Sequence, residues 1–221
     1  KRITTKILRC LRPEMMLKDE IVNFCMDLIN ARDDKFAKKI AENIAVTGKG
    51  VHGNAKTTRR KVLCMSSYFI VRYEELKYDS VKRWAKRRGV EDIFTLQRMI
   101  VPINICNLHW TFILIDFQKQ QIVYMDSLSL PDKKPSAGYT NPWANMVREY
   151  LEKTHYDLTR KELPPEWIAI HGSFPQQEDE FSCGVFVCMS AILLTDPCVS
   201  EVNGLVGLPL DLVQSNIPRV R

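Results

Sequence analysis

The apolar residues near the amino terminus recur at the spacing of one helix face. They are Leu17, Ile21, Val22, Phe24, Cys25, Leu28 and Ile29. This spacing predicts an amphipathic helix over Leu17–Ala31, continued more loosely through Phe36, Ile40 and Ile44. Three glycines in the segment Thr47–Asn54 then predict a surface loop that ends the helical pattern.

In the middle of the chain the pattern changes from helical to β-rich. Short apolar segments predict strands over Met99–Ile105, Trp110–Phe117 and Gln121–Met125. The second segment is almost entirely apolar, as expected for a strand that is covered on both faces. The three polar residues Gln118–Gln120 would form a tight connection between the second and third strands.

Two helices and one strand are predicted towards the carboxyl end. After a proline-containing loop over Ser127–Pro142, the pair Asn141-Pro142 marks a helix start, and this helix runs to about His155. Trp167–Ile170 is a candidate fourth strand. Cys183–Leu194 is apolar on every side, which predicts a helix buried in the core. The sum is an α+β domain in which a small sheet meets a central helix.

Composition is that of an ordinary water-exposed globular domain. The chain has 221 residues, of which 45% are hydrophobic and 26% charged, enough for one large domain or two small ones. No apolar run is long enough for a membrane span. Seven scattered cysteines, an odd number with no Cys-x-x-Cys pair, indicate buried thiols in a reducing compartment and no structural zinc site. Because the first residue is Lys1, we expect a fragment of a longer protein.

The net charge of +6 is concentrated in two basic stretches, Lys56–Lys61 and Lys82–Arg88. The second falls in a predicted basic helix over Glu74–Arg88 that ends at Gly89. Such runs are commonly solvated faces, and the alternative is a surface that docks an acidic protein or nucleic acid. Nucleic acid is the less supported partner, because no aromatic stacking motif or finger pattern accompanies the charge.

Cys183 stands where a helix is predicted to begin, directly after the polar loop Pro175–Glu180. Free amides and the dipole at a helix start favour a thiolate, which makes a cysteine there a candidate nucleophile. A buried, unreactive thiol is the alternative for Cys183 and the interpretation that we give to the other six cysteines.

All four histidines precede Cys183, which excludes an arrangement with the base downstream of this nucleophile. His171 lies in a predicted loop and His52 in the glycine-rich loop, so neither is expected to be held rigidly. His109 begins a predicted strand and is the candidate base, with a packed or capping histidine as the alternative.

Asp126 ends the third predicted strand and is the candidate for the acid that orients the base, although it could simply start a turn. If the second and third strands form an antiparallel hairpin, His109 and Asp126 lie beyond the same end of it. Their side chains can then meet, whereas a register slip of one residue would point them to opposite faces. A thiolate needs a base and an acid that fixes the base, so Cys183, His109 and Asp126 together predict a catalytic triad.

At these residues the chain resembles the Ulp/SENP family of cysteine peptidases, which release SUMO and related ubiquitin-like proteins. The matching pieces are Val101-Pro102-Ile103, His109-Trp110, Ile115-Asp116, Tyr124-Met125-Asp126-Ser127-Leu128, Pro175-Gln176-Gln177 and Cys183-Gly184-Val185-Phe186-Val187-Cys188. Their order and spacing agree, with 17 residues from His109 to Asp126 and Gln177 six residues before Cys183. The resemblance extends from about Leu17 to Leu194.

The resemblance implies a cysteine-peptidase fold of the α+β class. In it a small mixed sheet packs against the buried helix that carries the nucleophile, and further helices flank this core. It implies that His109 is the base, Asp126 the orienting acid, Cys183 the nucleophile and Gln177 the side-chain donor to the oxyanion. Trp110 looks like the aromatic residue that covers the substrate's diglycine tail in a narrow tunnel, a role compatible with ordinary core packing.

Two departures from the family pattern stand out. The family's first helix usually carries Trp-Leu-Asn-Asp, whereas this chain reads Met16-Leu17-Lys18-Asp19, so Asp19 matches as a substrate-binding residue and the tryptophan is absent. The loop before the nucleophile commonly reads Asn-Gly-Ser-Asp-Cys, and here it reads Asp179-Glu180-Phe181-Ser182-Cys183. The usual glycine and the aspartate next to the cysteine are both lost.

By resemblance, residues 1–221 form a single catalytic domain that cleaves after the C-terminal diglycine of SUMO, in precursor maturation and in release from target lysines. It would act as a monomer in the nucleus or cytoplasm on SUMO or another ubiquitin-like protein and its conjugates. No cofactor, metal, nucleic acid or membrane would be required. The alternatives are a deneddylase or deubiquitinase, an endoprotease of the adenoviral type, or a binding module whose site is impaired.

Overall fold

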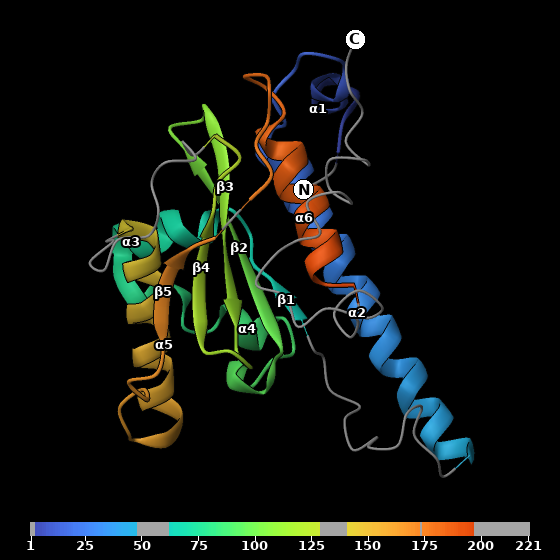
Figure 1. Cartoon of the computed structure of the whole chain (residues 1–221). Coiled ribbons are helices and arrows are strands. Elements are labelled where there is room, and N and C mark those ends of the chain that lie inside the picture. The colour runs from blue at the N-terminus through green and yellow to red at the C-terminus, as the bar shows by residue number, and fades with distance from the viewer. Residues whose placement is uncertain (1–2, 48–61, 129–140, 173, 197–221) are drawn as a thin grey trace.

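The computed structural model describes residues 3–47, 62–128, 141–172 and 174–196 (Figure 1). Its helices (α, with η for the 3₁₀ type) and strands follow in chain order. They are α1 (Thr5–Leu8), η1 (Arg9–Leu11), α2 (Asp19–Thr47), β1 (Val62–Cys64), α3 (Tyr68–Val81), α4 (Trp84–Arg87), η2 (Ile93–Thr95), β2 (Arg98–Ile105), β3 (His109–Asp116), β4 (Gln121–Met125), α5 (Pro142–Thr159), β5 (Ile168–His171) and α6 (Cys183–Leu194). None of the helices in these ranges is long and apolar enough to cross a membrane.

The strands form one mixed sheet of five, in the spatial order β1-β2-β3-β4-β5. The three central strands are antiparallel, and β1 and β5 join the two edges in parallel. In the register of β3 with β4, Phe112 lies opposite Met125 and Asp116 opposite Gln121. The predicted hairpin is therefore confirmed, together with the tight connection after β3. The α+β class and the mixed sheet expected from the resemblance are also confirmed.

Helices cover both faces of the sheet, with α2 and α6 on one side and α3 and α5 on the other (Figure 1). Successive residues of a strand point to opposite faces, so Phe112 and Leu114 join the cluster under α6, while Ile113 and Ile115 join the cluster under α3 and α5. Burial on both faces explains why the middle of β3, from Phe112 to Ile115, is entirely apolar.

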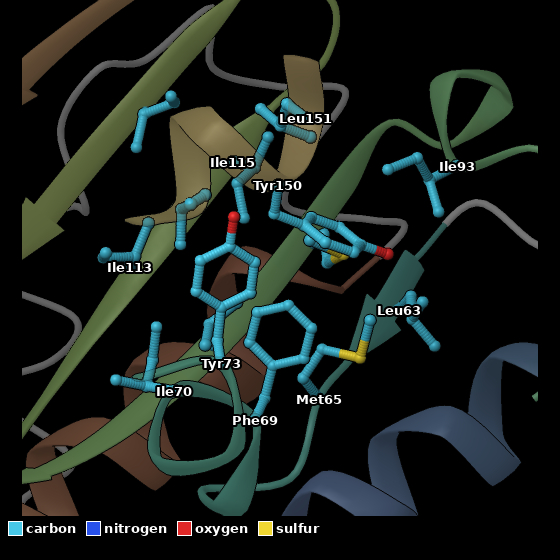
Figure 2. Packing of buried hydrophobic residues seen from close by; sticks show 14 of the residues in the cluster. Leu63, Met65, Phe69, Ile70, Tyr73, Ile93, Ile113, Ile115, Tyr150 and Leu151 are labelled. Carbon is cyan, nitrogen blue, oxygen red and sulfur yellow. The ribbon is translucent and has the colours of Figure 1, made fainter. Parts of the chain in front are cut away.

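The cluster under α3 and α5 is rich in aromatic rings (Figure 2). The Phe69 ring packs edge-on against the Tyr150 ring at a centroid distance of 5.0 Å and lies 6.4 Å from the Tyr73 ring. All three side chains are fully buried. Edge-to-face contacts of this kind add to the free energy gained from burial alone, so they fix α3 and α5 on the sheet.

The predicted bounds of α6 and β4 agree with the structure. The residues of the predicted helix over Glu74–Arg88 are mostly helical, but its prediction as one continuous helix is wrong. The structure has α3, which starts earlier at Tyr68, and a separate short α4. Lys77 adopts φ 57° and ψ −166° within α3, a conformation that no α-helix accepts. A single continuous helix is therefore not possible over this stretch.

Other boundaries also differ from the sequence-based expectations. The two helical patterns near the amino terminus form one helix of 29 residues, α2, and α5 extends to Thr159. The sequence-based prediction did not include β1, which has only three residues, or the short helices α1, η1 and η2. The basic stretch Lys56–Lys61 lies outside the described residues, as do most of the loops Thr47–Asn54 and Ser127–Pro142.

Candidate active site

The hairpin of β3 and β4 brings His109 and Asp126 together. His109 is the first residue of β3, and Asp126 follows directly after β4. The distance from His109 Nε2 to Asp126 Oδ1 is 2.7 Å, and both side chains are largely buried. The contact expected from the hairpin is thus present, and it is a charge-assisted hydrogen bond whenever His109 is protonated.

Electrostatics at this pair favour an imidazolium facing a carboxylate. The hydrogen bond to Asp126 and the interaction with the Cys183 thiol raise the pKa of His109 to about 9, against the opposing effect of burial. Burial would raise the pKa of Asp126, but hydrogen bonds from His109, the Leu128 backbone N–H and the Tyr124 hydroxyl lower it below the ordinary value. At neutral pH the pair therefore carries both charges.

Cys183 is the first residue of α6, and its side chain is 0% exposed. Its backbone N–H has no acceptor within the helix, because the first four N–H groups of a helix lack one. The thiol lies near enough to His109 to raise the pKa of the ring. The structure therefore brings together the three residues that the sequence proposed as a triad.

The two ring nitrogens of His109 have different surroundings. Nε2 is held by Asp126, whereas Nδ1 is buried and makes no hydrogen bond to any described residue. Nδ1 is consequently the nitrogen left to exchange a proton with the Cys183 thiol. Catalytic hydrogen bonds are commonly long in a free enzyme and shorten when substrate is present.

Gln177 lies in the loop before α6 and is buried. Its side-chain Oε1 accepts a 2.6 Å hydrogen bond from the Ser127 hydroxyl, and its Nε2 donates a 2.7 Å bond to the Asp179 carbonyl. An amide nitrogen carries two hydrogens, so one remains free to reach an oxyanion. The amide group is thereby held at its oxygen by Ser127, which follows β4, and at its nitrogen by Asp179, in the loop before α6.

The altered loop before Cys183 is ordered by Asp179. Its carboxylate accepts hydrogen bonds from the backbone N–H groups of Phe181 and Ser182 at 2.8 and 2.7 Å, and from the Ser182 hydroxyl. No residue from 178 to 182 has a positive φ. The family's usual glycine is thus not required by this backbone, because any residue can adopt the conformation seen here.

Trp110 is a core residue in this structure, with 1% of its surface exposed. Its indole N–H donates a 2.8 Å hydrogen bond to the Leu17 carbonyl, and it packs in the same cluster as Cys183. Asp19, the first residue of α2, instead accepts a 2.9 Å hydrogen bond from Ser67. Within the described residues, no hydrogen bond of Asp19 reaches Cys183, His109 or Asp126.

Sequence reasoning missed Ser127 and Asp179, which hold Gln177 and the loop in place. Ser127 is 1% exposed, although a serine after a strand is ordinarily a turn residue at the surface. The only sequence signal was its place within the Asp126-Ser127 pair. Nothing local indicates that its hydroxyl would meet a glutamine 50 residues later.

Two exposed leucines lie beside His109 and Asp126. Leu108, directly before His109, is 71% exposed, and Leu128, whose N–H bonds to Asp126, is 48% exposed. Exposed apolar side chains next to polar reactive groups are typical of surfaces that bind another protein. Neither leucine was predicted from the sequence as a site residue.

Comparison with known proteins supports the same picture. The family model described as "Ulp1 protease family, C-terminal catalytic domain" matches residues 15–219. Ubiquitin-like-specific protease 1 of Saccharomyces cerevisiae is 26% identical over 219 residues, which cover 99% of this chain and 28% of that protein. Sentrin-specific protease 2 of Homo sapiens is 26% identical over 195 residues, covering 86% of this chain and 27% of that protein.

Solved structures with the same fold include the C-terminal Ulp1 protease domain in complex with Smt3, the yeast ortholog of SUMO. That domain is 26% identical to this chain and superposes with a TM-score of 0.61, over 87% of this chain and 72% of the other. A structure of the SUMO protease Ulp1 with its catalytic cysteine oxidized to a sulfinic acid has the same TM-score at 25% identity, over 88% of this chain and 73% of that chain. With its five-stranded sheet and the family match over most of its length, the chain belongs to the Ulp1 protease family of cysteine peptidases.

Proposed function

We propose that this domain is a thiol protease that cleaves after the C-terminal diglycine of SUMO, both in its precursor and in its conjugates with target lysines. One observation carries the proposal: a single imidazole is bonded to Asp126 through Nε2 and has its other nitrogen available beside the Cys183 thiol. The chain spans under a third of the two protease relatives described above, so the activity is proposed for the domain.

Before the reaction His109 is already an imidazolium that carries the Cys183 proton on Nδ1, so the sulfur beside it is a thiolate. In the first step the sulfur attacks the carbonyl carbon of the substrate's last glycine. The oxygen takes up the negative charge and is bound by the free Gln177 N–H and the Cys183 backbone N–H. One such donor contributes on the order of 10²–10³ in rate.

In the second step the tetrahedral intermediate collapses. The carbon–nitrogen bond breaks, and His109 gives its proton to the leaving amine, which is a lysine Nζ in a conjugate or an α-amine in a precursor. Water then attacks the thioester with His109 as the base, and the carbonyl–sulfur bond breaks. The products are a free glycine carboxylate and the regenerated thiolate, with Asp126 holding the ring throughout.

Preference for glycine follows from the burial of the nucleophile. Cys183 is fully buried and lies in one cluster with Trp110 and Leu17, so the substrate tail must part the residues that cover the sulfur. A tail of two glycines has no Cβ atoms and needs the least space. The exposed Leu108 and Leu128 would contact the folded body of the ubiquitin-like protein.

The test uses SUMO, NEDD8 and ubiquitin, each carrying a C-terminal electrophile, and measures covalent attachment by mass spectrometry. We expect the SUMO probe to label wild-type protein at Cys183. Cys183→Ala should abolish labelling, while Cys106→Ala, which removes an exposed thiol, should leave it intact. Faster labelling by NEDD8 or ubiquitin would replace the proposed substrate, and labelling by none of them would indicate a binding module or another peptide substrate.

A further inference from the structure

A pocket of about 460 Å³ is lined by residues of α3, α4 and α5 and of the segment that leads into η2. Four cationic side chains line it, namely Lys82, Arg83, Lys86 and Arg87. Two hydroxyl residues of α5, Tyr150 and Thr154, also belong to its lining. The volume falls in the range of pockets that bind ligands in other proteins.

This basic pocket lies away from the candidate active site. Its lining includes Ile93, which precedes β2, whereas His109 follows the far end of that strand. An eight-residue strand that rises roughly 3.3 Å per residue separates the two ends. Figure 1 shows α4 near one end of the sheet, while α6 begins beside the other end. A ligand in the basic pocket would therefore not occupy the active site.

The cations of the pocket are only partly neutralised. Lys82 pairs with Asp79 at 2.5 Å, and Lys86 lies 3.7 Å from Glu91. The guanidinium groups of Arg83 and Arg87 make no ion pair with any described residue. They are four residues apart on neighbouring turns, where like charges repel each other. An acidic ligand would relieve this repulsion.

Buried hydroxyl groups in the lining also lack well-formed hydrogen bonds. The Tyr150 side chain is 0% exposed, and neither its hydroxyl nor the Thr154 Oγ1 makes a hydrogen bond of good geometry in the described chain, although the Thr154 side chain lies close to the hydroxyls of both Tyr150 and Tyr78. In Figure 2 the Tyr150 hydroxyl points to the side of the cluster on which Ile93 lies, and Ile93 lines the same pocket. Buried polar atoms are nearly always hydrogen-bonded in native proteins, so these two hydroxyls are places where a ligand can supply a better-formed hydrogen bond.

The rest of the lining favours a peptide over nucleic acid. Val90, Ile93 and Leu158 provide apolar contact area that a side chain can fill. Glu91 and Asp157 line the pocket as well, and their carboxylates would repel a phosphate backbone. A peptide instead brings backbone N–H groups that can donate to those carboxylates, while its own acidic side chains meet the arginines.

We propose that the basic pocket docks an acidic peptide segment of a partner protein. One apolar side chain of the segment enters the pocket, a polar group of the segment bonds to the Tyr150 and Thr154 hydroxyls, and flanking Asp or Glu residues pair with Arg83 and Arg87. This proposal does not depend on the protease activity. It assigns a partner-binding site to the face of the domain that carries α4 and α5.

The test is an array of short synthetic peptides in which the number of Asp and Glu residues and the position of one Phe or Leu are varied. Affinities of retained peptides are then measured in solution by fluorescence anisotropy. We expect acidic peptides with an apolar residue to bind, and peptides with Lys in place of Glu, or Ser in place of Phe, to lose at least tenfold in affinity. Retention of no acidic peptide would overturn the proposal.

Matched variants locate the binding site. The double variant Arg83→Glu/Arg87→Glu should weaken peptide binding at least tenfold, whereas Lys35→Glu/Lys39→Glu, with the same charge change on exposed positions of α2, should leave it within twofold. Tyr150→Phe should weaken binding several-fold with an unchanged circular dichroism spectrum. Equal effects of the two charge reversals would show attraction to net charge alone and would contradict the proposal.

Two further measurements separate the peptide from other anions. Sodium phosphate should displace the peptide no better than sodium chloride at equal ionic strength. Single-stranded DNA of equal charge should bind more weakly than the peptide. Tighter binding of DNA, or specific displacement by phosphate, would replace the proposed partner with a polyanion or a small anion.

Labelling of Cys183 by the SUMO probe should be the same in the Arg83→Glu/Arg87→Glu variant as in the wild type.

Discussion

Ser127 and Gln177 are joined by two hydrogen bonds. The Ser127 hydroxyl donates to the Gln177 side-chain Oε1 at 2.6 Å, and the Gln177 backbone N–H donates to the Ser127 carbonyl at 2.9 Å. Ser127 directly follows Asp126, and Gln176 donates a 3.1 Å bond to the Asp126 carbonyl. The strand end that carries the acid and the loop that carries the proposed oxyanion donor are thus fixed to each other.

We expect Ser127→Ala to lower kcat about fivefold with KM nearly unchanged. The lost hydrogen bond is worth roughly 1 kcal/mol, which frees the Gln177 amide to turn away from the oxyanion. The measurement is steady-state cleavage of a SUMO precursor. A rise in KM with kcat unchanged would instead mean that Ser127 acts on substrate binding.

A double-mutant cycle distinguishes positioning from general loss of structure. In a Gln177→Ala background the amide is already absent, so adding Ser127→Ala should cost no further rate. The single Gln177→Ala change should slow turnover more than it weakens binding, because it removes a group that acts on the transition state. Additive losses in the double variant would show that Ser127 acts independently of Gln177.

The sequence predicted the parts of this site that depend on local pattern. The hairpin follows from two apolar segments with a short polar connection, and α6 follows from an uninterrupted apolar run. Those two predictions sufficed to place His109 next to Asp126 and Cys183 at a helix start. By contrast, two hydrogen bonds of the Gln177 side chain, accepted from Ser127 and donated to Asp179, depend on the path of the loop before α6. No periodic pattern of residues in the sequence predicts the conformation of that loop.

The same distinction explains the wrong helix at Glu74–Arg88. Charged and apolar residues continue at helical spacing there, but Lys77 adopts a positive φ that ends the regular α-helix. Most residues other than glycine avoid this conformation, so the sequence carries no mark of the break. Tertiary packing of Phe69 and Tyr73 on the sheet decided where α3 lies.

The raised pKa of His109 makes stability depend on pH at mildly alkaline values. Its folded-state pKa is about 9, above the ordinary value of 6.5, so folding strengthens proton binding. The resulting stabilisation is fully present below pH 6.5 and is lost as the pH rises through about 9. We expect the free energy of unfolding, measured with urea, to fall over this interval in wild-type protein. The fall should be smaller in His109→Gln and unchanged in His155→Gln, a matched substitution on α5.

Gly184 is needed because α6 starts very close to Leu17 and Trp110. A Cβ added at Gly184 would lie 2.8 Å from Leu17 Cβ and 3.1 Å from Trp110 Cδ1. Neither atom is the free end of a flexible side chain, so α6 would have to shift. We expect Gly184→Ala to destabilise the fold by about 1–3 kcal/mol and to slow labelling of Cys183 by the SUMO probe.

The matched control for this change is Gly89→Ala. Gly89 has φ +78°, but a Cβ there would meet no atom within 4 Å. That variant should lose stability from backbone strain alone and label at the wild-type rate. Equal labelling rates for both variants would show that the position of the α6 start does not limit the reaction.

Leu108 offers a way to separate recognition of a folded substrate from the chemistry itself. It is 71% exposed on the turn before His109, and none of the proposed steps uses its side chain. Leu108→Asp places a charge on the surface where the ubiquitin-like protein would dock. We therefore expect kcat/KM for a SUMO precursor to fall at least tenfold, while a short peptide ending in Gly-Gly with a fluorescent leaving group is cleaved at the wild-type rate. Leu76→Asp, at a 58% exposed position on α3, should change neither rate. If the peptide and the precursor lost rate equally, Leu108 would be supporting the position of His109, and the apolar surface beside the triad would have no separate part in substrate binding.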